Sequence, residues 1–118
     1  MFRVIIAGSR SFDDYELLKS KMDKLLQNKT DITVVCGEAR GADSLGRQYA
    51  EERGFPILSF PADWKSLGKK AGYIRNEQMA HNADALVVFW DGQSRGTKNM
   101  IEIASRLGLQ IRIIRYQV

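Results

Sequence analysis

Short apolar runs alternate along this chain with stretches that repeat apolar residues at helical spacing, and this alternation limits the fold most strongly. The runs at residues 2–8, 32–36 and 85–90 are short, and β-branched residues are frequent in them. They are typical of strands buried on both faces, whereas apolar spacings of three and four residues are typical of amphipathic helices. The sequence therefore predicts the order βαβαβαβαβ and a parallel sheet with helices on both faces.

N-capping aspartates, glycines and prolines mark the expected ends of the elements. Strands are predicted at residues 2–8, 32–36, 57–60, 85–90 and 111–116, helices at about 15–28, 42–53, 70–81 and 97–107, and a loop at 62–68. Prolines flank the third strand and arginines interrupt the fifth, so we expect both at sheet edges. Central first and fourth strands then give the order 3-2-1-4-5 in a three-layer α/β/α sandwich.

The composition favours one globular domain over residues 1–118. Hydrophobic residues make up 44% and charged residues 27%, close to globular averages. The single cysteine, Cys36, excludes an intramolecular disulfide, and the single His81 leaves no histidine pair for a metal, so we expect neither metal nor cofactor. No apolar run approaches the roughly 20 residues of a membrane span, and the N-terminus lacks a signal-peptide pattern. We expect a cytoplasmic protein without a membrane partner, either bacterial or phage-encoded and expressed in the host cytoplasm.

Four loops are expected to meet where the strand order reverses, beyond the carboxyl ends of the first and fourth strands. The first loop begins with Gly8, which lets the backbone turn closely after the strand. Ser9 offers a hydroxyl, and Arg10 offers a rigid fork for phosphate or carboxylate. The alternative is an ordinary turn with a surface arginine.

The second loop places an acid and a base between two glycines, Gly37 and Gly41. Glu38 follows a strand end, a position from which carboxylates bind ribose hydroxyls, and Arg40 is a second cation. Asp43 falls in the first turn of the next helix, where a negative charge is favourable even without a ligand. A solvated loop would explain these residues equally well.

The third loop carries Asp63 and Trp64, and it leads to Arg75 and Asn76 near the start of a helix. A tryptophan in such a loop can stack on a base or can close the edge of the core. Arg75 has an equally simple explanation as a cation on a helix surface.

The fourth loop, residues 91–97, gives the strongest physical indication of anion binding. Arg95, Gly96 and Thr97 combine a cation, free amides and a hydroxyl at a helix N-terminus, which suits a phosphate. The spacing is not that of a Walker A loop.

Taken in order, these loops resemble the YspA-like, cpYpsA-related branch of the SLOG superfamily of Rossmann-like nucleotide-binding proteins. The matching segments are residues 8–12, 37–43 (G-x-A-R-G-A-D), 61–64, 72–79 (G-Y-x-R-N-x-x-M) and 95–97. The resemblance implies a Rossmann-like sheet that binds a nucleotide-derived small molecule, and it is compatible with a homo-oligomer.

The superfamily also contains lonely-guy phosphoribohydrolases, which use an arginine and a glutamate, and recombination mediators that bind single-stranded DNA. Arg75 is similar to the hydrolase arginine. The position of the hydrolase glutamate is occupied by Met100, and Glu102 lies two residues further on. If the chain is an enzyme, the candidate catalytic residues are therefore Glu38, Arg75 and Glu102.

Three functions remain open. We expect a sensor, carrier or binding module for a nucleotide-derived ligand, with an N-glycosidic hydrolase or transferase as the alternative. Single-stranded nucleic acid is the third reading and is not expected as the main partner. The formal charge of +4 is modest for a surface that follows phosphates, and acids alternate with the cations near the four loops.

Overall fold

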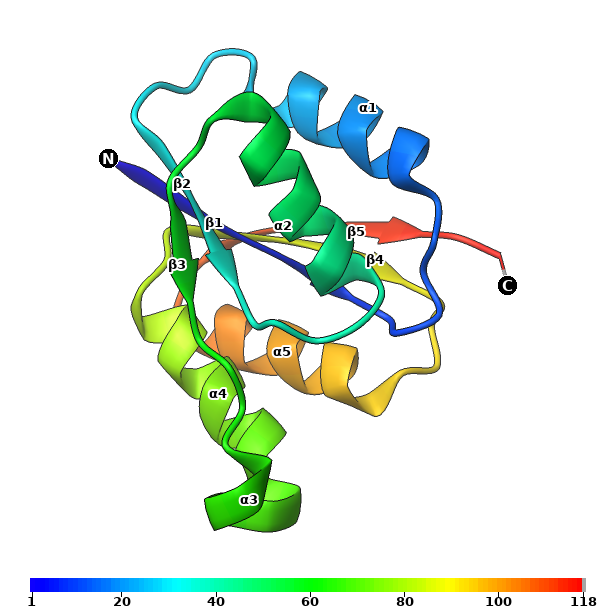
Figure 1. Ribbon diagram of the computed structural model, residues 1–118, viewed down its shortest axis with the longest axis vertical. Helices are drawn as coiled ribbons and strands as arrows, with labels where there is room; N and C mark the ends of the chain where they lie inside the picture. Colours follow the sequence, from blue (N-terminus) through cyan, green and yellow to red (C-terminus); the bar gives the residue numbers. More distant parts are fainter. Residues whose placement is uncertain (118) are drawn as a thin grey trace.

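The computed structural model describes residues 1–117 as a parallel sheet of five strands between two layers of helices (Figure 1). The strand order is β3-β2-β1-β4-β5, which confirms the predicted order 3-2-1-4-5. The elements are β1 (Phe2–Gly8), α1 (Tyr15–Leu26), β2 (Ile32–Cys36), α2 (Ala42–Arg53), β3 (Ile57–Ser59), α3 (Trp64–Leu67), η1 (Gly68–Lys70), α4 (Ala71–His81), β4 (Ala85–Trp90), α5 (Arg95–Arg106) and β5 (Gln110–Arg115).

The sheet separates two apolar cores because alternate residues of a strand face opposite sides. Val4 and Ile6 of β1 pack with α1 and α2, whereas Ile5 and Ala7 pack with α4 and α5. Helices α1 and α2 therefore cover one face and α4 and α5 the other (Figure 1). Burial on both faces explains why the central strands are continuously apolar.

Strands β1 and β4 end side by side, and this places the predicted site. Their register pairs Gly8 with Phe89, and the Ser9 amide donates to the Phe89 carbonyl at 3.0 Å. The loops that follow the two strands consequently leave the sheet at the same point. That point is where the strand order reverses, the usual ligand position in open α/β sheets.

The prediction of a loop at residues 62–68 is wrong, because residues 64–68 form α3 and the beginning of η1. The side chain of Asp63 accepts a hydrogen bond from the Ser66 amide at 3.1 Å and so caps α3. No residue of this four-residue helix is buried, and a helix without a buried face has no apolar period to detect in the sequence. Figure 1 shows α3 projecting beyond the end of α4.

Smaller differences concern the ends of elements, such as those of α5 and β5. Helix α5 begins at Arg95, two residues earlier than predicted, because Ser94 caps it. Strand β5 runs from Gln110 to Arg115 instead of 111–116. Among residues 1–117, no helix has the length and apolar character needed to cross a bilayer.

Candidate functional site

Two adjoining cavities lie beyond the carboxyl ends of β1 and β4, and together they form the groove. The α5 cavity, of about 200 Å³, reaches the N-terminus of α5. The Glu38 cavity, of about 330 Å³, lies along the loop after β2. Arg10, Ala39, Trp64 and Arg75 line both cavities, which shows that the two are continuous.

Most of the residues predicted from sequence line this groove. The α5 cavity is lined by Gly8, Arg10, Asp43, Trp64, Arg75, Asn76, Gly96 and Thr97, and the Glu38 cavity adds Gly37, Glu38 and Arg40. Three other predicted residues, Asp63, Arg95 and Glu102, are exposed and line neither cavity.

Ser9 and Gly41 do not line the groove but hold its loops together. The Ser9 hydroxyl accepts from the Asp91 amide at 3.1 Å, which joins the loop after β1 to the loop after β4. Gly41 has a φ of 75°, and a Cβ at this position would lie 2.3 Å from the Ser9 carbonyl oxygen. A close backbone approach of this kind requires glycine.

Four polar side chains are buried among residues 1–117, and all four belong to the predicted site: Ser9, Asp43, Asn76 and Thr97. Burial of polar groups is informative, because it is unfavourable unless hydrogen bonds compensate for lost water. Asn76 accepts from Arg75 Nε at 3.0 Å and donates to the Gly96 carbonyl at 3.3 Å. It thereby links α4 to the start of α5. We call these four residues the floor of the groove, in which Asp43, Asn76 and Thr97 line the α5 cavity and Ser9 joins the loops after β1 and β4.

The N-terminus of α5 opens into the α5 cavity. The Ser94 hydroxyl accepts from the Thr97 amide at 3.4 Å and from the Thr97 hydroxyl at 3.1 Å. At Gly96, none of the described atoms lies within 4 Å of the position that a Cβ would take. First-turn amides of a helix lack intrahelical partners and attract anions, so this open space suits a phosphate.

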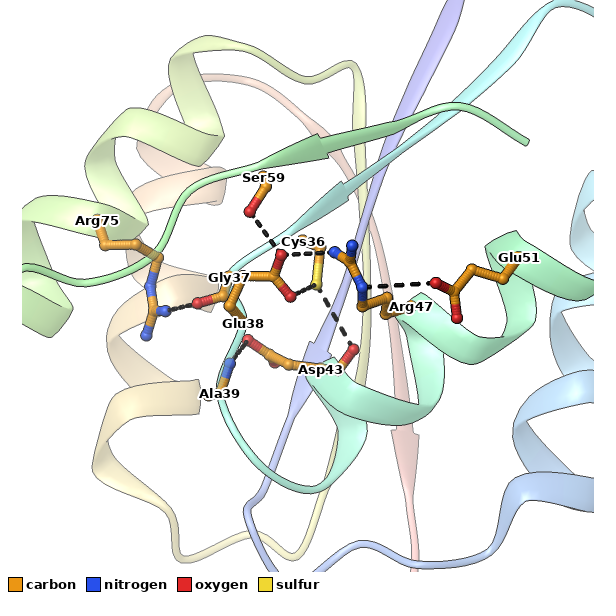
Figure 2. A network of polar contacts seen from close by, with 9 residues as sticks. All are labelled: Cys36, Gly37, Glu38, Ala39, Asp43, Arg47, Glu51, Ser59 and Arg75. Carbon is orange, nitrogen blue, oxygen red and sulfur yellow. Dashed lines mark hydrogen bonds and ion pairs between the residues drawn. The ribbon is translucent and has the colours of Figure 1, made fainter. Parts of the chain in front are cut away.

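Arg75 and the floor residue Asp43 bring opposite charges to the α5 cavity. Arg75 Nη1 donates to the Gly37 carbonyl (Figure 2). Asp43 Oδ2 accepts from the Ala39 amide at 3.4 Å (Figure 2). Burial raises the pKa of Asp43 to about 6, although the charge of Arg75 and the bond from Ala39 act in the opposite direction. Asp43 is therefore easier to protonate than an ordinary aspartate.

Glu38 lies at the centre of a second polar cluster (Figure 2). One carboxylate oxygen accepts from Ser59 and from Arg47, each at 2.5 Å, and the other accepts from the Cys36 thiol at 3.3 Å. Partial burial opposes ionisation, but these bonds and the charge of Arg47 lower the pKa of Glu38 below its ordinary value. Burial raises the pKa of Cys36 to about 12, which makes the thiol a poor nucleophile.

Residues 63–73, which we call the rim, border the groove from α3, η1 and the start of α4. The side chains of Trp64 and Tyr73 are both 50% exposed, and both line the α5 cavity. The guanidinium of Arg10 lies 6.0 Å from the centre of the Trp64 ring. Lys69 adds a second cation to the same cavity.

Several residues that line the α5 cavity are not among the site residues predicted from sequence, and Met79, Met100 and Ser94 are three of them. Met79 and Met100 are almost fully buried and form apolar parts of its wall. Their helical spacing made them indistinguishable from ordinary core residues. Ser94 falls three residues before Thr97, and this spacing of a small polar residue could have indicated the helix cap. Among residues 1–117, no group of three histidine, cysteine, aspartate or glutamate side chains is placed to hold a metal ion.

Fold and groove together define a Rossmann-like protein with a groove at the switch point of its sheet. The chain belongs to the YspA, cpYpsA-related SLOG family, whose family model matches residues 2–66. It is also 35% identical over 118 residues to the Gene 61 protein of Mycobacterium phage D29, with 94% of each chain covered.

Solved structures show the same fold at lower identity. TM1055, a structural genomics target, is 21% identical with a TM-score of 0.70, over 94% of this chain and 72% of that one. DNA processing protein A (DprA) from Streptococcus pneumoniae is 18% identical with a TM-score of 0.74, over 99% of this chain and 51% of that one. DprA from Helicobacter pylori is 17% identical with a TM-score of 0.72, over 99% of this chain and 66% of that one.

This chain thus spans about half the length of the Streptococcus protein. Family and fold support nucleotide-related binding or processing in general.

Proposed function

We propose that the chain is a binding module for a nucleotide-derived ligand whose phosphate lies against the N-terminus of α5. The observation that carries this proposal is that Gly96 and Thr97, in the first turn of α5, line a cavity that Arg10 and Lys69 also line. The partial positive charge of the helix end and the two cations would act on one anion. A phosphate offers several oxygens for these donors at once.

The other residues that line the groove suit the ribose and the base of a nucleotide. Asp43, in the first turn of α2, places carboxylate oxygens beside the cavity, where they would accept hydrogen bonds from ribose hydroxyls. Trp64 and Tyr73 expose half of their surfaces at the opposite border. Aromatic faces of this kind stack on bases of any sequence. The proposal therefore treats residues 1–118 as one nucleotide-binding domain.

Binding is favoured over N-glycosidic hydrolysis because neither glutamate that the sequence suggests as catalytic is free in the groove to stabilise an oxocarbenium-like state. Met100 lines the cavity where the phosphoribohydrolases carry their glutamate. Glu102 is exposed on α5 away from both cavities. Both oxygens of Glu38 already accept hydrogen bonds from Ser59, Arg47 and Cys36.

The phosphate position is tested by calorimetric titration. The natural protein is titrated with AMP and with adenosine, and the Gly96→Asp and Gly96→Asn variants are titrated with AMP. An aspartate in the first turn is favourable for the helix but repels phosphate. We expect Gly96→Asp to fold normally and to weaken AMP binding by at least roughly tenfold, because charge-assisted hydrogen bonds are lost.

The asparagine variant is nearly the same size and controls for steric effects. Equal binding of AMP and adenosine by the natural protein would contradict the proposal. An AMP affinity that Gly96→Asp leaves unchanged would contradict it as well.

Single-stranded DNA is a second candidate ligand, favoured by the composition of the rim. The rim, residues 63–73, contains three lysines and one acid, Asp63, and it exposes Trp64 and Tyr73. Cations combined with exposed aromatic side chains are typical of single-strand binding. DprA from Helicobacter pylori, which shares the fold, binds single-stranded DNA.

A gel-shift assay at increasing salt distinguishes this ligand from a small nucleotide. Binding that weakens steeply with salt and is reduced by Lys69→Gln with Lys70→Gln supports it. Lys24→Gln on α1 is the matched control. Absence of a shift at low salt excludes this candidate.

A further inference from the structure

Glu38 joins three elements of the fold through its side chain. It accepts hydrogen bonds from Ser59 at the end of β3, from Arg47 on α2 and from Cys36 at the end of β2 (Figure 2). Only 26% of its side-chain surface remains exposed. Because both carboxylate oxygens are occupied within the protein, the side chain is poorly placed to bind a ligand or to act as a base.

The backbone of Glu38 is held in an unfavourable conformation. Its φ is 60°, in the left-handed region, where a residue other than glycine is disfavoured by about 1–2 kcal/mol. Such conformations persist where the surrounding contacts determine them, and they concentrate at functional sites. The three side-chain hydrogen bonds supply that constraint here.

The two peptide groups that flank Glu38 form hydrogen bonds with Arg75 and Asp43. The Gly37 carbonyl accepts from Arg75, and the Ala39 amide donates to Asp43. Space at this point is small, because a Cβ on Gly37 would lie 2.7 Å from both Arg75 Nη1 and Asp43 Oδ2. A small displacement of this segment would therefore move both charged groups.

We propose that Glu38 is a positioning residue, which fixes the backbone of residues 37–39 so that Arg75 and Asp43 are presented correctly to the groove. This inference rests on the proposed nucleotide function of the groove. It assigns Glu38 a role different from the catalytic one that the sequence suggested. The side chain acts through its neighbours and does not contact the ligand.

The partners of Glu38 provide the test, because Ser59 and Arg47 line neither cavity. We compare Glu38→Gln, Ser59→Ala, Arg47→Met and the double variant Glu38→Gln with Ser59→Ala by calorimetric titration with AMP. We expect each single variant to weaken AMP binding by roughly three- to tenfold, and the double variant to bind no worse than Glu38→Gln alone. Non-additivity of this kind is the mark of residues that act as one unit.

The matched control is Glu51→Gln. Glu51 pairs with the outer side of Arg47 at 3.7 Å and is not bonded to Glu38. We expect its AMP affinity to equal that of the natural protein. If Glu38→Gln weakens AMP while Ser59→Ala and Arg47→Met do not, Glu38 contacts the ligand itself and the inference is wrong. Additive losses in the double variant, or no loss in any variant, would overturn it equally.

A spectroscopic measurement without ligand separates this inference from the proposed function. The ¹⁵N resonance of Arg75 Nε should be resolved and protected from exchange, because the guanidinium is bonded to Gly37 and Asn76. We expect Ser59→Ala and Glu38→Gln to lose this protection while Glu51→Gln keeps it.

If that pattern is found and AMP does not bind, the proposed function fails and the positioning role stands. If protection is the same in all variants, the positioning role is refuted even when AMP binds.

Discussion

The floor of the groove buries its polar groups, whereas the rim exposes its aromatic and basic ones. The floor residues Asp43 and Asn76 are about 5% exposed, and each is held by a hydrogen bond: Asp43 accepts from the Ala39 amide, and Asn76 donates to Asn99 on α5. Trp64 and Tyr73 of the rim are half exposed. Under the proposed function, we expect the floor to be rigid around the phosphate and the rim to adapt to the outer part of the ligand.

Glycine substitutions should give the largest difference in the free energy of unfolding between the floor and the rim. Gly41 beneath the floor and Gly68 in the rim have similar backbones, with φ, ψ of 75°, −127° and 58°, −136°. A Cβ on Gly41 would lie 2.3 Å from the Ser9 carbonyl oxygen, whereas nothing in the described structure lies within 4 Å of one on Gly68. We expect Gly68→Ala to lower the free energy of unfolding by about 1–2 kcal/mol and Gly41→Ala by roughly 4 kcal/mol or more.

Urea unfolding of both variants measures this difference. Gly68→Ala is the control for backbone strain alone. Equal destabilisation would show that the floor is not tightly packed at Gly41.

The pH dependence of stability tests the burial of Asp43. Because its folded pKa is raised from 3.8 to about 6, the folded protein binds this proton more tightly than the unfolded chain does. The associated stability is fully present below the unfolded value and is lost as pH rises through 6. The loss amounts to about 3 kcal/mol, and Asp43→Asn should not show it.

Unfolding free energies of the natural protein and the Asp43→Asn variant, measured on both sides of this range, provide the comparison. We expect the stability of the natural protein relative to the variant to fall as pH increases. A difference that stays constant with pH would mean that Asp43 is not buried in this way.

Trp64 should affect binding more than folding. We expect Trp64→Ala to weaken AMP binding by about 1–2 kcal/mol, the usual contribution of a stacked base. Its effect on thermal unfolding should be small, because half of the side chain is already exposed. Leu67→Ala is the control, since Leu67 is a comparably exposed rim residue that lines neither cavity. If both variants bind AMP as the natural protein does, the rim does not hold the base.

Removing helix caps should give the smallest difference in the free energy of unfolding between the two regions. Ser94 caps a helix of 12 residues that packs on the sheet, whereas Asp63 caps the four-residue α3, which buries no side chain. We expect Ser94→Ala to lower the unfolding free energy by about 1 kcal/mol and Asp63→Ala by less than about 0.5 kcal/mol. Chemical denaturation measures both. A larger effect of Asp63→Ala would show that the rim contributes to global stability.

The floor could be predicted from sequence to a much greater extent than the rim. Gly8, Gly37 and Gly96 interrupt the apolar pattern where strands end or helices begin, and this placed the loops that converge on the groove. Helix α3 could not be predicted in this way, because it has no buried residue and hence no period.

The contacts within the floor lay beyond sequence reasoning for another reason. Arg75 reaches the Gly37 carbonyl across 38 positions, and Asp91 reaches Ser9 across 82. Such pairings depend on the exact packing of helices on the sheet. The same limitation made Glu38 look like a free carboxylate, since its bond to Ser59 joins the ends of two neighbouring strands.

The most direct test of the central claim is to follow the backbone amide resonances of Gly96 and Thr97 by ¹H–¹⁵N NMR during titration with AMP and with adenosine. A phosphate at the N-terminus of α5 would accept from the Gly96 amide and lie beside the Thr97 amide, which donates to the Ser94 hydroxyl. We predict a large, saturable shift of the Gly96 amide with AMP and little change with adenosine. Saturable AMP binding that leaves the Gly96 and Thr97 resonances unmoved would contradict the account, as would the same shifts with adenosine.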